Sequence, residues 1–134
     1  METQKSKIGF TCSAFDFCHT GHVAMLEEAK EHCNYLIVGL HTNPQIDRPH
    51  KNKPIQTTFE RYYQLKGCKF IDEILPYDTE EDLVNMLKII KPDVRIIGQE
   101  YKDRDFTGKD LPIEIYYNTR EHNYSSSDLR KRLQ

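Results

Sequence analysis

The sequence lacks any apolar segment long enough to cross a membrane, since no stretch approaches the roughly 18 consecutive apolar residues that a bilayer requires. It also lacks the pattern of a signal peptide, because residues 1–7 are polar and contain no apolar run. These two absences predict a cytoplasmic protein that does not engage a membrane.

The sequence also has little excess of positive or negative charge. The 19 Lys and Arg residues face 21 Asp and Glu residues, and the formal net charge of -2 argues against a nucleic-acid-binding coat or a polybasic anchor. The four cysteines, Cys12, Cys18, Cys33 and Cys68, form no C-x-x-C pair, so we expect reduced thiols rather than disulfides. A local basic site for a small anion remains compatible with this composition.

The hydrophobic pattern alternates along the chain, and 134 residues suit one domain, residues 1–134. Short apolar runs separated by amphipathic segments predict an α/β fold with a doubly wound parallel sheet of about five strands. The expected strands are Ile8–Ser13, Tyr35–Leu40, Ile71–Leu75, Val94–Gly98 and Ile113–Tyr117. The expected helices are His22–His32, Thr57–Lys66, a segment from Thr79 to Pro92, and a final one from Ser125.

The connections at residues 42–56 and 99–112 exceed the usual length of about 2–6 residues in such units. Both follow a strand, at the carboxyl edge where ligands bind in open α/β sheets, and they therefore predict a substrate site there. The helix at 57–66 is expected to pack four side chains on the sheet: Phe59, Tyr62, Tyr63 and Leu65.

The densest chemical signal is His19-Thr20-Gly21-His22, at the turn from the first strand into the first helix. Helix N-termini present unbonded N–H groups and favour bound phosphate, and Gly21 allows an anion to approach the backbone. Imidazoles there can donate hydrogen bonds to phosphate oxygens. Two other interpretations remain open. His19 and His22 are a helix cap and a half-buried helix residue, or they bind a metal together with Cys12 or Cys18.

Positive side chains gather on the long loop after the second strand, where Arg48, His50, Lys51 and Lys53 stand close together. These side chains either stay solvated on the surface of the loop or contact the phosphates of a bound ligand. Near the C-terminus, Ser125–Ser127 precede a helical pattern and follow Arg120. These hydroxyls suit either a helix cap or the far phosphates of a nucleotide.

An ordered set of segments resembles the nucleotidyltransferase superfamily, and within it most closely bacterial glycerol-3-phosphate cytidylyltransferases. The set comprises Phe15-Asp16 with the H-x-G-H at 19–22, the strand and its end at 35–43, Lys51–Pro54 with Glu60-Arg61, the strand at 70–74, and Arg120 with Ser125–Ser127. The resemblance covers nearly the whole chain and implies a Rossmann-like nucleotidyltransferase fold. Departures from the family pattern are Ser13-Ala14 for Gly-Thr, Lys69 for arginine and Asn123 for glycine.

The resemblance implies transfer of CMP from CTP to a small phosphorylated alcohol, glycerol 3-phosphate, with release of pyrophosphate. It further implies Mg²⁺ carried by the nucleotide, no metal ligand from the protein, and a homodimer. The implied catalytic residues are His19, His22 and Lys51. The implied nucleotide-binding residues are Ser13, Ala14, Phe15, Gly98, Gln99, Arg120, Ser125, Ser126 and Ser127. The implied acceptor-binding residues are Asp16, Lys53, Arg61 and Lys69.

Other activities stay open within the same resemblance. They are adenylyl transfer, cytidylyl transfer to phosphocholine, phosphoethanolamine or a phosphosugar, and a nucleotide-binding module without turnover.

Overall fold

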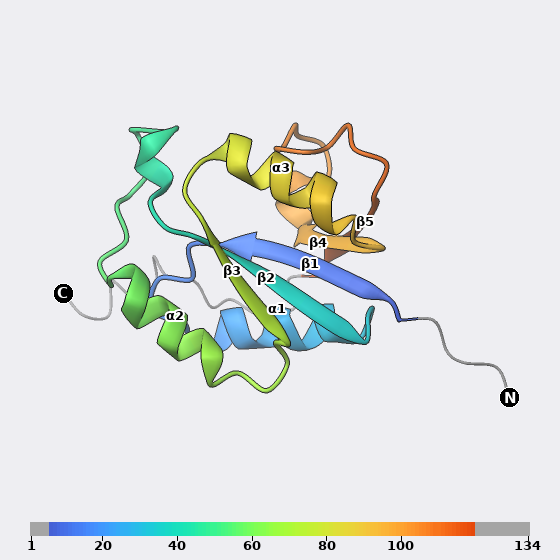
Figure 1. The fold of residues 1–134 in the computed structure, drawn as a ribbon. Helices are drawn as coiled ribbons and strands as arrows, with labels where there is room; N and C mark the ends of the chain where they lie inside the picture. The colour runs from blue at the N-terminus through green and yellow to red at the C-terminus, as the bar shows by residue number, and fades with distance from the viewer. Residues whose placement is uncertain (1–5, 120–134) are drawn as a thin grey trace, which may run out of the picture.

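The computed structural model describes residues 6–119, and these form a five-stranded parallel sheet with helices on both faces (Figure 1). The sheet has the order β3-β2-β1-β4-β5, which confirms the predicted doubly wound α/β fold. The strands are β1 (Ile8–Ser13), β2 (Tyr35–His41), β3 (Glu73–Tyr77), β4 (Val94–Gly98) and β5 (Glu114–Asn118). The α-helices are α1 (Thr20–Lys30), α2 (Thr58–Lys66) and α3 (Glu80–Ile90), and short 3-10 helices cover Pro44–Ile46 and Gln99–Tyr101.

The sheet is centred on β1, which pairs with β2 on one side and with β4 on the other. The chain leaves β1 toward β2 and β3, then returns to β4 and β5. The order of strands therefore reverses beside β1, and a ligand crevice is expected at the carboxyl ends of β1 and β4. Both long loops, 42–56 and 99–112, follow strands at this same edge.

The core lies in two layers, one on each face of the sheet (Figure 1). Helices α1 and α2 contribute Leu26, Ala29 and Leu65 to the larger layer. Helix α3 contributes Leu83 and Leu87 to the smaller one, against Phe10, Ile37 and Tyr77 of the sheet. Alternate residues of each strand enter opposite layers, because successive side chains of a strand point to opposite faces.

Local capping explains where α2 and α3 begin. Thr57 accepts the backbone N–H of Glu60, whose carboxylate accepts the backbone N–H of Thr57 in return. Thr79 and Asp82 form the same reciprocal pair at the start of α3. Each pair satisfies two N–H groups that would otherwise lack a partner at a helix N-terminus.

Two predictions about the fold were wrong in detail. The third strand begins at Glu73 and continues through Pro76 to Tyr77. An edge strand such as β3 tolerates proline, since one side of it has no ladder to donate to. Phe59 and Tyr63 are 70% and 62% exposed, so they point away from the core that Leu65 enters. The predicted helix from Ser125 lies outside the described residues.

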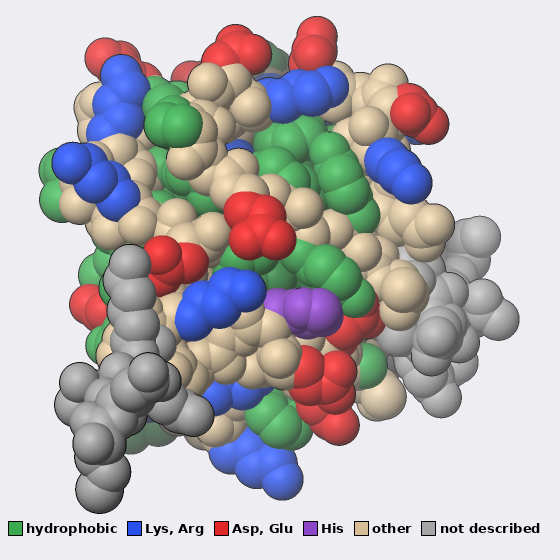
Figure 2. Space-filling model, turned by 90° about the vertical axis from the view of Figure 1, so that its right-hand side faces the viewer, with side chains coloured by type: hydrophobic (Ala, Val, Ile, Leu, Met, Phe, Trp, Pro, Cys, Tyr) green, Lys and Arg blue, Asp and Glu red, His purple; other side chains and the backbone are tan. Residues whose placement is uncertain are grey.

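None of the helices found within residues 6–119 is both long and apolar enough to span a bilayer. On the side of the molecule where β1 begins, acidic and basic side chains alternate without a patch of one sign (Figure 2).

Candidate active site

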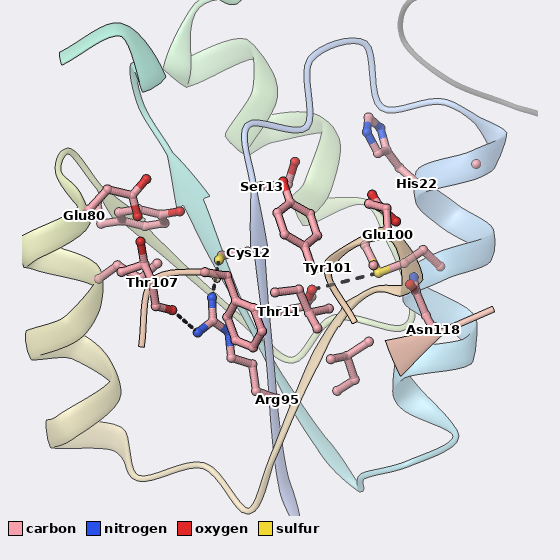
Figure 3. A pocket seen from close by; sticks show the side chains of 18 of the residues that line it. Thr11, Cys12, Ser13, His22, Glu80, Arg95, Glu100, Tyr101, Thr107 and Asn118 are labelled. Atoms are coloured by element: carbon pink, nitrogen blue, oxygen red, sulfur yellow. Dashed lines mark hydrogen bonds between the residues drawn. The ribbon is translucent and has the colours of Figure 1, made fainter. Parts of the chain in front are cut away.

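A cavity of about 380 Å³ lies at the carboxyl ends of β1 and β4 (Figure 3). Its walls come from the end of β1, the start of α1, the loop after β2, the start of α3, β4 and the loop after β4. Within the described part of the chain, four of the residues implied as site residues line it: Ser13, His19, His22 and Gly98. The cavity therefore occupies the crevice that the strand order predicts.

His19 is the N-cap of α1, and its position is fixed by reciprocal hydrogen bonds with the first turn. Its Nδ1 accepts the backbone N–H of Gly21 at 3.0 Å, and its own backbone N–H reaches Nδ1 of His22 at 3.4 Å. The two rings stack with centroids 4.0 Å apart. Because each Nδ1 accepts a hydrogen bond, its proton, if the ring is neutral, is on Nε2, and either form of the ring has an Nε2–H donor.

The charge state of His22 follows from its surroundings. Burial, reinforced by the neighbouring His19, lowers the pKa of His22 to about 4, against a smaller opposing effect of Asp16. The edge of the Phe15 ring packs on the imidazole, with centroids 5.2 Å apart. His22 is therefore neutral at physiological pH and acts as a hydrogen-bond donor rather than as a cation.

The loop between β1 and α1 that carries these histidines has an unusual backbone. Phe15 and Phe17 have φ angles of 52° and 51°, in the left-handed region that side chains rarely adopt. The Phe17 N–H donates to the Gln56 side chain, and Phe15 is buried in the core. Such conformations persist only where surrounding contacts hold them, and they concentrate at functional sites.

Asp16 and Arg61, both implied as acceptor-binding, are buried inside the protein instead of facing the cavity. The Asp16 carboxylate accepts the backbone N–H groups of Ile55 and Gln56, each at 3.0 Å. Arg61 donates to four backbone carbonyls, located just after β1, at and just after the end of β2, and before α2, and to one hydroxyl at the start of α2. These acceptors are Ala14, His41, Thr42, Gln56 and Thr58. Through these hydrogen bonds, both side chains hold together the loops after β1 and β2 and the segment before α2, at the carboxyl edge of the sheet.

The remaining implied residues stand at different places. Lys51, Lys53 and Lys69 are exposed and do not line the cavity. Gln99 is exposed at the start of the 3-10 helix after β4, whereas Ala14 offers its carbonyl to Arg61. Arg120 and Ser125–Ser127 lie outside the described residues, so their implied contacts with the nucleotide stay predictions.

Sequence reasoning missed Arg95, which lines the cavity from the middle of β4. Its guanidinium donates to the Thr107 carbonyl, approaches Cys12 Sγ at 4.0 Å and lies over the Phe106 ring at 5.2 Å. A charged residue inside the otherwise apolar run Val94–Gly98 was the signal that marked this position. Charged side chains are rarely buried without a specific reason.

The other missed groups surround Arg95 and the mouth of the cavity. Arg48, noted only as loop charge, lines the cavity and pairs with Glu80 at 3.6 Å. Burial raises the pKa of the Cys12 thiol and of the Tyr77 hydroxyl, so both are protonated at neutral pH. No nucleophilic thiolate is therefore present on this wall.

The two histidines and the nearby cysteines are not arranged as a metal site. Within residues 6–119, no group of three or more His, Cys, Asp or Glu side chains is placed to hold a metal ion. His19 and His22 stack on each other instead of converging on a common point with Cys12 or Cys18.

The comparison with known proteins agrees with the geometry. The Campylobacter jejuni protein named bifunctional protein HldE is 30% identical over 134 residues, which cover 99% of this chain. Its Helicobacter hepaticus counterpart is 31% identical over a similar span. This chain covers only 29% and 28% of those two relatives' lengths. The crystal structure of a lipopolysaccharide core biosynthesis protein from Thermoplasma volcanium shares the fold, with a TM-score of 0.71, 21% identity, and coverage of 86% of this chain and 98% of that one.

A family model decides the assignment, because it matches almost the whole sequence rather than one motif. The model is described as cytidylyltransferase-like, and its match runs over residues 10–132. It therefore includes the paired histidines, most of β1 and all of β2 to β5. The chain belongs to the cytidylyltransferase-like family.

Proposed function

We propose that the protein transfers a nucleoside monophosphate from a nucleoside triphosphate to a small phosphorylated alcohol, with CTP and glycerol 3-phosphate as the specific pair. The observation that carries this proposal is the pair of stacked, cap-fixed histidines at the N-terminus of α1. The resemblance of the ordered sequence segments supports the choice of CTP and glycerol 3-phosphate.

The proposed reaction is one in-line displacement at phosphorus. An oxygen of the acceptor phosphate attacks the α-phosphorus of the triphosphate, and the bond from that phosphorus to the bridging oxygen breaks, which releases pyrophosphate. No general base is needed, because a phosphate monoester with a second pKa near about 6 is already an anion. Catalysis then consists of positioning and of stabilising the charge on the transferred phosphoryl group.

The histidines are suited to this task by their fixed rings. The Nε2–H of His22 can donate to a non-bridging phosphate oxygen, and the stacked ring of His19, whose own Nε2 is buried, holds His22 in place. Each Nδ1 is held by a backbone N–H. The amide groups of the first turn of α1 add their positive partial charge at the same place. Because His22 is neutral, it stabilises negative charge through its hydrogen bond and loses no proton during the reaction.

The remaining parts of the proposal concern residues around the cavity. Lys51 on the loop 42–56 would cover the triphosphate, while Ser13 and Gly98 line the site where the nucleotide would lie. Mg²⁺ would arrive on the phosphates of the nucleotide as part of the substrate, because a triphosphate carries charge that a divalent cation neutralises. The homodimer implied by the resemblance stays a prediction.

The test is release of pyrophosphate from CTP and ATP across a panel of acceptors. The panel contains glycerol 3-phosphate, phosphocholine, phosphoethanolamine and a phosphosugar. We expect turnover with CTP and glycerol 3-phosphate, and we expect His22→Ala to lower kcat about 100- to 1000-fold, as loss of a preorganised donor does elsewhere. The control is Val23→Ala, the next residue of α1, whose side chain is exposed and lies outside the cavity.

Three results would contradict parts of the proposal. A fully active His22→Ala variant that remains folded would remove the histidine mechanism. Turnover with ATP or with another acceptor, but not with the proposed pair, would replace the specific substrates and leave nucleotidyl transfer standing. Binding of CTP in calorimetry without pyrophosphate release from any pair would show a binding module instead of an enzyme.

A further inference from the structure

The most unusual charged group in the cavity is Arg95, because it is buried and has no carboxylate partner among the residues that the structure describes. Its side chain sits in β4 and the residue is only 4% exposed. Among residues 6–119, no Asp or Glu oxygen forms an ion pair with it. A buried cation of this kind is costly unless something compensates its charge.

Arg61, the other buried arginine, has a guanidinium whose N–H donors find protein acceptors. Arg61 is 2% exposed and donates to five protein oxygens. Arg95 donates to one oxygen, the Thr107 carbonyl, and makes a weak contact with Cys12 Sγ. A guanidinium carries five N–H donors, so Arg95 retains donors that no oxygen of the described chain accepts.

The fold directs these donors to one side of the cavity. Val94 and Ile96 enter the core layer under α1 and α2, so Arg95 between them lies on the face covered by α3. His22 stands at the start of α1, on the other side of β1 from α3 (Figure 3), and His19 is the N-cap of the same helix. One cavity connects the two positions, and a molecule whose phosphate reaches the histidines can extend its other end toward Arg95.

Within residues 6–119, the two carboxylates that line the cavity do not form an ion pair with Arg95. Glu80 is paired with Arg48 at 3.6 Å, and Glu100 stands in the 3-10 helix after β4. Cys12 and Tyr77 are protonated and carry no negative charge at neutral pH. The α3 side of the cavity is therefore built for a ligand that supplies oxygen acceptors, and it repels a ligand that brings a positive charge.

We propose that Arg95 binds the oxygen-bearing end of the phosphorylated acceptor and makes the enzyme select polyol or sugar phosphates over phosphorylated amino alcohols. This inference rests on the proposed function and adds to it the residue that discriminates between acceptor classes. Hydroxyl or anionic oxygens accept the unused N–H groups of Arg95. The ammonium of phosphoethanolamine or the trimethylammonium of phosphocholine would lie against an unpaired guanidinium.

The test separates acceptor binding from nucleotide binding with Arg95→Met and Arg95→Lys. Met keeps the length of the side chain beside Phe106, and Lys keeps the charge but not the fork. We expect Arg95→Met to raise the KM for glycerol 3-phosphate, or for the phosphosugar that supports turnover, about 10- to 100-fold while leaving the KM for the nucleotide unchanged, because a charge-assisted hydrogen bond is lost. Arg95→Lys should lie between this variant and the wild type.

The same variants test selectivity. The ratio of kcat/KM for the oxygen-rich acceptor over that for phosphoethanolamine should fall at least about tenfold in Arg95→Met, since the repulsion disappears as well. The control is Arg104→Met, which removes an exposed positive charge from the same loop region outside the cavity. It should leave both KM values and the ratio unchanged.

Several results would overturn the proposal. They are an unchanged acceptor KM in Arg95→Met, equal increases of both KM values, or an unchanged ratio between acceptors. If the wild type releases no pyrophosphate with any pair, the proposed function fails separately, and calorimetric titration of glycerol 3-phosphate into the wild type and Arg95→Met then decides the role of Arg95. Equal Kd values would reject it, and weaker binding by the variant would support it. If Arg95→Met does not fold, the same comparisons are made with Arg95→Lys.

Discussion

Replacing Arg61 by methionine tests whether this buried arginine holds the carboxyl edge of the sheet together. Its guanidinium reaches the His41 carbonyl at 2.7 Å, the Thr42 carbonyl at 2.6 Å and the Ala14 carbonyl at 3.0 Å. Its Nε donates to the Gln56 carbonyl at 3.2 Å. The side chain thus joins the segment after β1 and the end of β2 to the segment before α2.

The magnitude follows from the groups left behind. Arg61→Met leaves several buried carbonyls without a donor, and each unsatisfied buried group costs about 1–3 kcal/mol. Water that enters the gap and the removal of a buried charge offset part of the sum, so we expect the free energy of unfolding to fall by about 3–5 kcal/mol. Arg61→Lys keeps one cation with fewer donors and should lose about half as much, roughly 2 kcal/mol.

Urea denaturation of the wild type, both Arg61 variants and Arg104→Met measures these differences. Arg104 is an exposed arginine, and its replacement should change the free energy of unfolding by no more than about 0.5 kcal/mol. An Arg61→Met protein within about 1 kcal/mol of the wild type, with a raised KM for the acceptor, would refute the structural role. That outcome would return Arg61 to the acceptor-binding role that the sequence resemblance implied.

Two further predictions concern pH and packing. Folding lowers the pKa of His22 from 6.5 to about 4, so between these two pH values the unfolded chain binds the proton more readily than the folded protein. The free energy of unfolding should therefore decrease by up to about 1.4 kcal/mol per pH unit as the pH falls from 6.5 toward 4. Urea midpoints measured across this range should fall less steeply in His22→Gln, and identical slopes would show that His22 is not the group responsible. Gly39→Ala would place a Cβ 2.9 Å from Phe10 Cζ in the centre of the sheet and should cost about 1–3 kcal/mol. Gly67→Ala, whose Cβ would meet only the Gln64 carbonyl at 3.5 Å, should have nearly wild-type thermal stability, and equal losses in the two variants would contradict this account.

The features that sequence reasoning predicted well depend on residues close together in the chain. The start of α3 at Thr79 follows from a cap and an acidic first turn within four residues. The position of His19 and His22 at a helix N-terminus follows from a glycine and an apolar helical pattern directly after a strand. The parallel sheet follows from alternation of strands and helices, because such connections are almost always right-handed crossovers.

The features that sequence reasoning missed depend on partners far apart in the chain. Arg61 meets carbonyls 47 and 20 residues away, so its burial could not be seen from its neighbours. Cys12 near Arg95 is 83 residues distant. In α2, the apolar pattern is shared by Phe59, Tyr63 and Leu65, and only the docking of the helix decides that Leu65 is buried while the two aromatic rings are exposed.

The sequence by itself determined the strand–helix alternation, the family and the placement of two histidines at a helix start, because local periodicity, capping and short motifs specify each of them. Only the tertiary structure decided which charged side chains face the cavity. Burial and hydrogen bonding depend on segments brought together by the sheet order β3-β2-β1-β4-β5. Two arginines of similar burial therefore have different surroundings, because Arg61 donates to five oxygens of residues 6–119 and Arg95 to one of them.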